Sequence, residues 1–174
     1  MKIIHIATTV TLIILGSCNT NGQVNEQKLT LEAIVKGVYD ISDNPDKVYI
    51  LVDVILHNKS TSAYSFVTYT CATHLNLVLD SKQAAICGNK CGSNSPKQIN
   101  IPENKTLVIP IIIETTGGTS DGFINPLKVG LVLLQTKDYT EVMRLIYRKK
   151  ERNEDIIWSA PFYLNDFGQP YTIY

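Results

Sequence analysis

The stretch from Val48 to Leu56 constrains the fold more than any other. Val, Ile or Leu occupies every second position of its sequence, VYILVDVIL, and Tyr49, Leu51 and Ile55 stand between them. A period of two residues is the period of a β-strand. A strand that is apolar on both faces is typical of the interior of a sheet, where both faces are covered. We therefore expect a long central strand here.

Further strands are predicted where apolar residues alternate or cluster between turn-forming residues. Pro110 lacks an N–H, so its strand should be an edge strand or should carry a bulge there. Leu75, Leu77 and Leu79 should share one face of their strand. The predicted strands cover residues 29–36, 64–71, 74–80, 98–101, 106–114, 127–135 and 156–164.

One segment has the period of a helix. Apolar side chains recur at helical spacing between residues 138 and 150, namely Tyr139, Val142, Met143, Ile146 and Tyr147. Asp138 is suited to be its N-cap. We expect an all-β, immunoglobulin-like sandwich of two sheets, with about seven or eight strands and one short helix near 138–150. A closed barrel is the alternative.

The N-terminal 17 residues have the pattern of an export signal. Lys2 precedes an apolar run from Ile3 to Leu15, which is too short to span a bilayer, and small residues follow it. Leu15-Gly-Ser-Cys18 resembles the lipobox of bacterial lipoproteins. The resemblance implies that Cys18 becomes the acylated N-terminus, with 18–27 as a tether and 28–174 as the domain. The alternative is an ordinary secretory signal.

Charge gives no reason to expect a nucleic-acid partner. The chain has 16 basic and 16 acidic residues, and removal of residues 1–17 takes away one basic side chain, Lys2. Nucleic-acid binding normally requires a clear basic excess.

Three cysteines remain beyond Cys18. Export favours disulfides, so one bridge from Cys71 to Cys91 or between Cys87 and Cys91 is expected, with one cysteine left over. The spacing Cys71-x2-His74 with Cys87-x3-Cys91 also matches a structural zinc site. Residues three apart on a strand point to opposite faces, however, so we expect no metal and no cofactor.

Four short segments together resemble small uncharacterised outer-envelope lipoproteins of the Bacteroidetes. The segments are FVTYTC (66–71), CGSNSP (91–96), PENKT (102–106) and IWS (157–159). The resemblance implies a location at the outer membrane and a bridge between Cys71 and Cys91, which leaves Cys87 as the extra cysteine. Ala72-Thr73-His74 departs from the family's pattern, in which an aromatic residue follows the first cysteine. No activity comes with the resemblance.

No catalytic motif is present in the sequence. It lacks a nucleophile elbow, a phosphate loop, a metalloprotease motif and a dinucleotide fingerprint. Cys87 and His74 could form a thiol–imidazole pair, but nothing in the sequence brings them together. We expect Trp158 in the sandwich core and a solvated basic helix end at 144–152. We therefore expect that the protein is not an enzyme.

The expected function is a lipid-anchored binding or accessory module of the cell envelope. A protein or glycan ligand should contact the loops at 81–96 and 115–126, because loops on rigid scaffolds carry function. The alternative is an inhibitor or immunity-type protein. Leu56-His57-Asn58-Lys59-Ser60 resembles one hairpin of the intracellular proteinase inhibitors of the BsuPI type.

Overall fold

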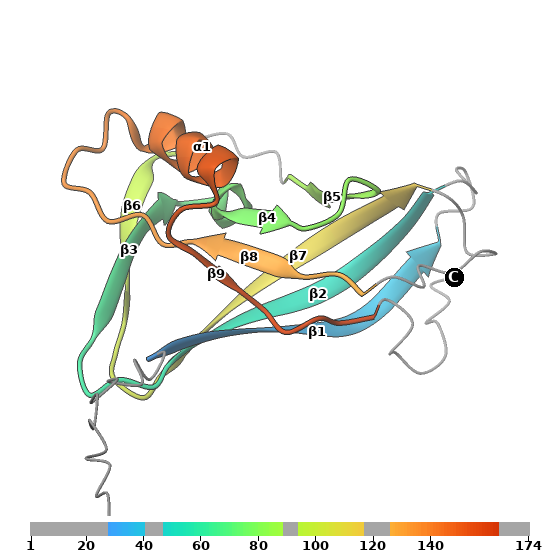
Figure 1. Ribbon diagram of the computed structural model, residues 1–174, viewed down its shortest axis with the longest axis horizontal. Coiled ribbons are helices and arrows are strands. Elements are labelled where there is room, and N and C mark those ends of the chain that lie inside the picture. Colours follow the sequence, from blue (N-terminus) through green and yellow to red (C-terminus); the bar gives the residue numbers. More distant parts are fainter. Residues whose placement is uncertain (1–27, 41–46, 89–93, 117–125, 164–174) are drawn as a thin grey trace, which may run out of the picture.

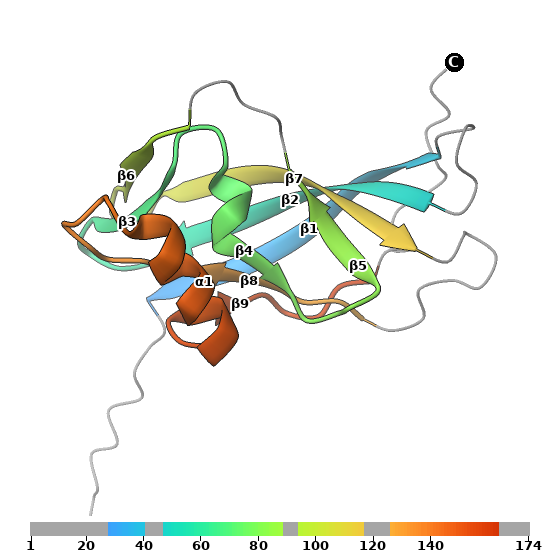
Figure 2. The same ribbon diagram turned by 90° about the horizontal axis from the view of Figure 1, so that it is seen from above.

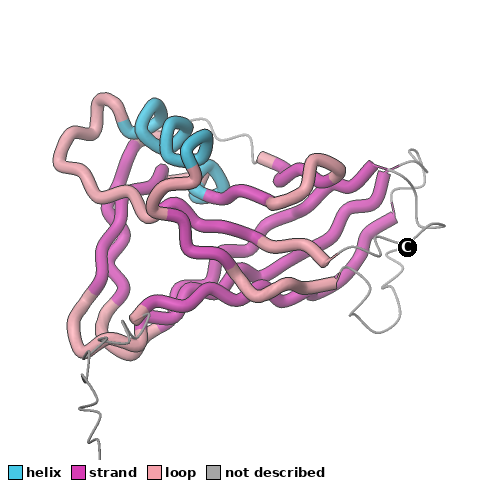
Figure 3. Tube along the Cα trace, viewed as in Figure 1, coloured by secondary structure: helices cyan, strands magenta, loops and turns pink. Residues whose placement is uncertain are grey.

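The computed structural model describes residues 28–40, 47–88, 94–116 and 126–163, which form mostly antiparallel strands (Figures 1 and 3). Cys18, Cys91, the signal, the tether and most of the 115–126 loop lie outside these ranges. The elements are β1 (Leu29–Asp40), β2 (Lys47–Asn58), β3 (Tyr64–Tyr69), the 3-10 helix η1 (Thr73–Asn76), β4 (Leu77–Leu79), β5 (Ala84–Cys87), β6 (Pro96–Ile101), β7 (Thr106–Thr116), β8 (Val129–Val132), α1 (Val142–Arg152) and β9 (Ile156–Trp158).

The largest sheet has the strand order β1-β2-β7-β5, and all its neighbours are antiparallel. The predicted central strand is confirmed, because β2 lies between β1 and β7. Along β2 every second side chain is buried and the others are half-buried. The register between β1 and β2 shifts between Val35 and Gly37. The two-residue period of the sequence therefore directs one row of side chains into the core.

A second layer covers the inner face of this sheet. It is the three-stranded sheet β4-β8-β9, and the antiparallel pair of β3 and β6 stands at a steep angle at one end (Figure 1). Val52, Val54, Ile113 and Leu131 are fully buried in the main apolar cluster. The predicted all-β, sandwich-like class with one short helix is confirmed.

Helix α1 closes one end of the sandwich (Figure 2). Val142 and Ile146 are fully buried against Val67 and Val132, in a second apolar cluster. The helix begins at Val142 and not at residue 138. Asp138 instead accepts hydrogen bonds from the N–H and the hydroxyl of Thr140, at 2.9 and 2.6 Å, which form a turn before the helix.

The strand predicted over residues 74–80 is wrong in its first half. Residues 73–76 form η1, and only Leu77–Leu79 is a strand. The reason is Asn76, whose buried amide donates to the carbonyls of Val67 and Val132, at 3.0 Å each. Leu75 consequently packs with the α1 cluster, while Leu77 packs in the main core. These two leucines do not share a face.

The predicted loop at 81–96 contains a strand. β5 has only four residues and no alternation in its sequence, Ala-Ala-Ile-Cys, yet it pairs with residues 112–115 of β7. Pairing with the edge of β7 therefore gives this segment a strand structure that its local sequence does not predict.

Pro110 lies within β7 without a bulge. The register between β7 and β2 is unbroken from Thr106 to Thr116. On the other side of β7, β5 pairs no further than Ile112, and no described strand pairs with residues 106–111 there. The expectation of an edge at Pro110 is met on this one side of the strand.

Candidate functional site

The open edge of β7 presents main-chain groups that no described strand uses. Pro110 pairs with Asp53 of β2 and has no N–H, so it fits the position of an antiparallel pair that exchanges no hydrogen bonds. Its carbonyl then points away from β2. By the two-residue period, the N–H and carbonyl of Val108 point the same way. Val108 is 50 % exposed, so this edge is accessible.

A cleft runs along this edge, because β6 and β7 diverge after the turn that joins them. The cavity has a volume of about 430 Å³. Ile99 and Lys97 of β6 form one wall, and residues 107–112 of β7 form the other. Thr73, His74 and Cys87 close it at the η1 and β5 end. We call this cavity the β7 cleft.

Apolar side chains dominate the β7 side of the cleft. Val108 and Ile112 are 50 % and 38 % exposed, and Leu51 of β2 lies beside Ile112 in the sheet register. Cys87 continues the same row on β5. Exposed apolar side chains in a row on a sheet are typical of contact surfaces.

The structure brings Cys87 and His74 to the same cleft, although their sequence positions do not predict it. The His74 ring packs against Gly88, where an added Cβ would lie 3.0 Å from Nε2. Burial, and secondarily the charge of Lys150, lowers the pKa of His74, so the neutral imidazole is favoured. The cleft therefore holds a neutral histidine, whose position depends on η1.

The thiol of Cys87 is not prepared for nucleophilic attack. Burial and the Glu114 carboxylate raise its pKa, and its Sγ lies 3.9 Å from Oε2 of Glu114. Activated thiols need the opposite shift. Glu114 also forms an ion pair with Lys47 at 2.5 Å. This arrangement gives no thiolate–imidazole pair.

Cys71 is disulfide-bonded, and Cys87 has a free thiol. The N–H of Cys71 donates to Oδ1 of Asn94 at 3.4 Å, and the N–H of Thr70 donates to the carbonyl of Ser95 at 2.9 Å. These two bonds place Asn94 and Ser95 beside Thr70 and Cys71. The predicted bridge between Cys71 and Cys91 stays a prediction, because Cys91 lies outside the described residues.

Trp158 lies outside both apolar clusters, and the expectation of a core tryptophan is wrong. Its ring packs over Gly130 on the face of the β4-β8-β9 sheet that points away from the main core. Its indole N–H donates to Oδ1 of Asn153 at 3.3 Å, and the side chain is half-buried. Gly130 provides the space that the ring occupies.

The basic helix end is largely neutralised by local ion pairs. Arg144 pairs with Glu141, Lys149 pairs with Asp155, and Arg152 lies 3.9 Å from Glu154. This pairing favours the interpretation as a solvated helix end. On β2, Nε2 of His57 lies within hydrogen-bond distance of Oε2 of Glu32, at 3.2 Å. Among the described residues, no three His, Cys, Asp or Glu side chains could hold a metal ion.

The described part of the chain has no helix with the length and apolar character needed to span a membrane. No protein-family model, curated protein or solved structure significantly matches this chain.

Proposed function

We propose that the protein is a lipid-anchored, non-enzymatic binding module of the bacterial cell envelope, and that the β7 cleft takes an extended segment of a partner protein. The open edge of β7 beside the cleft carries this proposal. Main-chain N–H and carbonyl groups at strand spacing are best paired by another main chain, and strand addition is a known mode of peptide recognition. Neighbouring pockets for alternate side chains supply specificity in that mode.

The chemistry of the cleft favours a peptide over a glycan. A peptide strand would pair with Val108 and Pro110 and would place every second side chain against Val108 and Ile112. A glycan has no regular row of donors and acceptors that matches this edge. The described part of the predicted 81–96 loop contributes Cys87 to the cleft wall. The 115–126 loop stays a predicted second contact.

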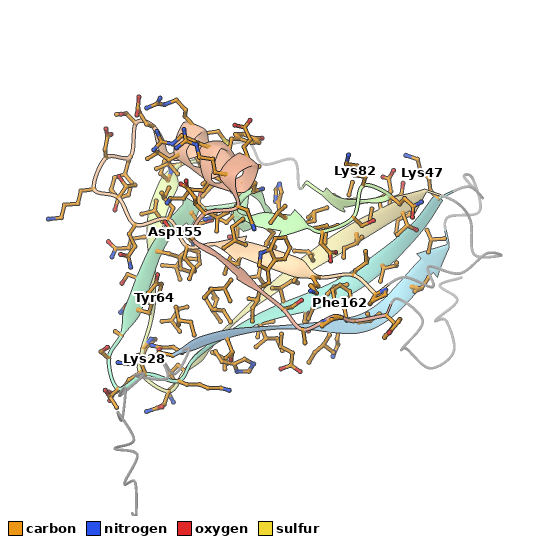
Figure 4. All side chains as sticks on the ribbon, in the orientation of Figure 1. Lys28, Lys47, Tyr64, Lys82, Asp155 and Phe162 are labelled. Atoms are coloured by element: carbon orange, nitrogen blue, oxygen red, sulfur yellow. The ribbon has the colours of Figure 1, made fainter. Side chains whose placement is uncertain are left out.

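The proposed anchor would decide how the cleft lies relative to the membrane. The described chain begins at Lys28, at the lower corner in Figure 4, whereas β4 and β5 lie along the upper side in the same view (Figure 1). A polar tether of ten residues from Cys18 has a reach of about 15 Å. The outer membrane would then lie near the corner at Lys28, which is also the corner where β7 begins, because the Lys59 N–H donates to the carbonyl of Lys28 and the Asn58 N–H to that of Lys105. The Val108 end of the cleft would lie nearer the membrane, and the β5 end would be turned away from it.

Replacing Cys18 by Ser should release the protein from membranes. The acyl chains contribute roughly 0.8 kcal/mol for each buried CH₂ group, and the substitution removes their attachment site. The measurement is membrane fractionation of cells with a carbonate wash, with Cys87→Ser as the matched control that keeps the anchor. A Cys18→Ser protein that stays in the washed membrane fraction would exclude lipid anchoring.

Replacing Val108 by Pro should abolish strand addition while preserving the fold. The substitution removes an N–H that no described strand uses, and its ring blocks an incoming strand. The probe is a phage-displayed library of ten-residue peptides, selected on the wild-type domain. Selected peptides should bind the Val108→Pro protein at least tenfold more weakly, which corresponds to about 1.4 kcal/mol.

Two further variants control this experiment. Pro110→Val adds an N–H to the same edge and should retain or improve peptide binding. Ile109→Pro removes an N–H that points toward β2 and should instead destabilise the domain. If no peptide is selected, or if the selected peptides bind Val108→Pro as well as wild type, strand addition at β7 is excluded.

The alternative function, an inhibitor or immunity-type protein of the envelope, would use the same cleft. It differs in its ligand, because it requires one tight protein partner and not a class of extended peptides. The Asn58 turn that resembles the BsuPI-type hairpin has a structural role here, since its side chain is 1 % exposed and bonded to main-chain groups. The resemblance of this turn therefore does not favour the inhibitor function.

A further inference from the structure

Asp53 lies in the middle of β2, on the outer face of the largest sheet, where its side chain is half-buried. The four nearest positions on that face are all apolar. They are Leu51 and Ile55 along β2, Ile34 of β1 and Pro110 of β7. Aspartate is uncommon within strands, and a carboxylate among apolar side chains needs a counter-charge to offset its loss of water.

No cation in the described part of the protein pairs with the Asp53 carboxylate. Two other acidic side chains share the outer face, and both have partners there. Glu32 lies within hydrogen-bond distance of His57, and Glu114 forms an ion pair with Lys47. Asp53 is therefore the one carboxylate on the described outer face whose charge is not compensated within the chain.

The β7 cleft reaches the outer face directly beside Asp53. Pro110 is exposed and lines the cleft, and Leu51 of β2 lines it as well. The open edge of β7 is thus only one strand away from Asp53, with Pro110 between them. A pyrrolidine ring is short, so a longer side chain from beyond the edge can pass over it.

A strand added to this edge would place one of its side chains in the same row as Pro110 and Asp53. Residues directly opposite each other on neighbouring strands point to the same face of a sheet. Neighbouring strands lie about 4.8 Å apart, so the partner residue opposite Pro110 would have its Cα about 10 Å from that of Asp53. Only a long side chain spans this distance, and arginine and lysine are the long cationic ones, each with an apolar stem.

We propose that Asp53 selects partner segments that carry an arginine or lysine opposite Pro110. This inference rests on the proposed function, because it requires a partner strand on β7. The cationic group pairs with the Asp53 carboxylate, while its stem packs over Pro110 and Leu51. Arginine is favoured, because its planar guanidinium group can bind both carboxylate oxygens. The partner residue two positions away lies opposite Val108 and points to the same face, where Val108 and Ile55 favour an apolar side chain.

The alternative explanation is that Asp53 only keeps the apolar outer face from associating. Charged side chains on exposed sheets oppose non-specific contacts between molecules. On that explanation, removing the charge would promote self-association and would leave the affinity for an added strand unchanged. The two explanations therefore predict different results for the same substitution.

The test selects ten-residue phage-displayed peptides in parallel on the wild-type, Asp53→Asn and Asp53→Lys proteins. Peptides from the wild type should share an arginine or lysine two residues from an apolar residue. Peptides from Asp53→Lys should carry an aspartate or glutamate at that position instead. Both variants should fold, because the Asp53 side chain has no partner within the described structure to lose.

Affinity measurements then locate the effect. Peptides selected on the wild type should bind Asp53→Asn about tenfold more weakly. Glu32→Gln is the matched control, because it removes the same charge from the same face, one strand further from the open edge, and it should leave the affinity unchanged. Replacing the cationic residue of the peptide by methionine should weaken binding to the wild type by a similar factor, but should have little effect on binding to Asp53→Asn.

The outcomes separate this inference from the proposed function. Selected peptides that lose affinity for Val108→Pro, but bind Asp53→Asn as tightly as wild type, would overturn the inference and leave strand addition standing. Equal losses in Asp53→Asn and Glu32→Gln would mean that only net charge matters and would also overturn it. If no peptide is selected on the wild type, strand addition fails and the inference fails with it.

Discussion

Replacing Asn58 by Leu is expected to lower the free energy of unfolding by about 4 kcal/mol. The Asn58 amide donates to the carbonyls of Ser62, Ile101 and Pro102, at 2.9, 3.1 and 3.1 Å. Its carbonyl accepts from the N–H and the hydroxyl of Ser60, at 3.1 and 2.7 Å. One side chain thus connects the end of β2, the turn that follows it and the turn between β6 and β7.

Leucine has the same number and branching of side-chain heavy atoms as asparagine but can make none of these bonds. Each buried group left without a partner costs about 1–3 kcal/mol, and water can compensate only the partly exposed ones. Unfolding in urea, followed by the fluorescence of Trp158, measures the difference. Asn100→Leu is the matched control, because Asn100 is exposed and its Oδ1 accepts a hydrogen bond from the Ser65 hydroxyl, at 3.1 Å. It should change stability by less than about 0.5 kcal/mol. Equal losses in both variants would contradict the assigned role of Asn58.

Replacing Gly130 by Ala should destabilise the domain by about 2 kcal/mol. An added Cβ would lie 2.6 Å from Cγ2 of Ile156 and 3.0 Å from Cε3 and Cζ3 of Trp158. The indole ring is rigid and Ile156 belongs to a packed cluster, so neither side chain can move without loss of contacts. The emission of Trp158, the single tryptophan, should shift along with the loss of stability.

A double-mutant cycle separates this steric clash from a general effect of alanine in the strand. Ile156→Ala removes the atom closest to the added methyl group. The Gly130→Ala substitution should therefore cost at least 1 kcal/mol less in the Ile156→Ala background. Additive losses would show that crowding between these two side chains is not the cause.

The long strands were predictable because their signals are local. The alternation in β2 and β7 fixes which side chains enter the core, and the position of β2 in the centre of the sheet follows from its two apolar faces. The helix stripe was predicted correctly in its middle, where Val142 and Ile146 are the buried residues of α1, whereas Tyr139 precedes the helix and both Tyr139 and Tyr147 are exposed. In each case the pattern extends over two or more turns or several alternations.

The errors lie where a distant contact decides the local structure. Residues 73–76 form a 3-10 helix because Asn76 bonds to β3 and β8, and neither bond is visible in the sequence around Asn76. β5 is a strand because β7 offers it an edge. Trp158 packs over Gly130, which lies 28 positions earlier in the chain. Its place outside the core therefore depends on a contact that the sequence around Trp158 does not show.

The candidate sites were only partly predictable for the same reason. Cys87 and His74 stood out by residue type, but their common cleft depends on η1 and β5, the two elements that the sequence did not predict. The row that joins Asp53 to Pro110 depends on the register between β2 and β7, which no local pattern fixes. Pro110 was the exception, because a missing N–H is a local property that marks an open edge from the sequence alone.

Hydrogen exchange at the Val108 amide tests the central claim most directly. In the free protein this N–H should exchange rapidly, since no described strand pairs with it, whereas the N–H of Ile109 should be protected by β2. Binding of a selected peptide should slow exchange at Val108 at least tenfold and leave Ile109 unchanged. A Val108 amide that is already protected in the free protein, or that exchanges equally fast with the peptide bound, would contradict strand addition at β7.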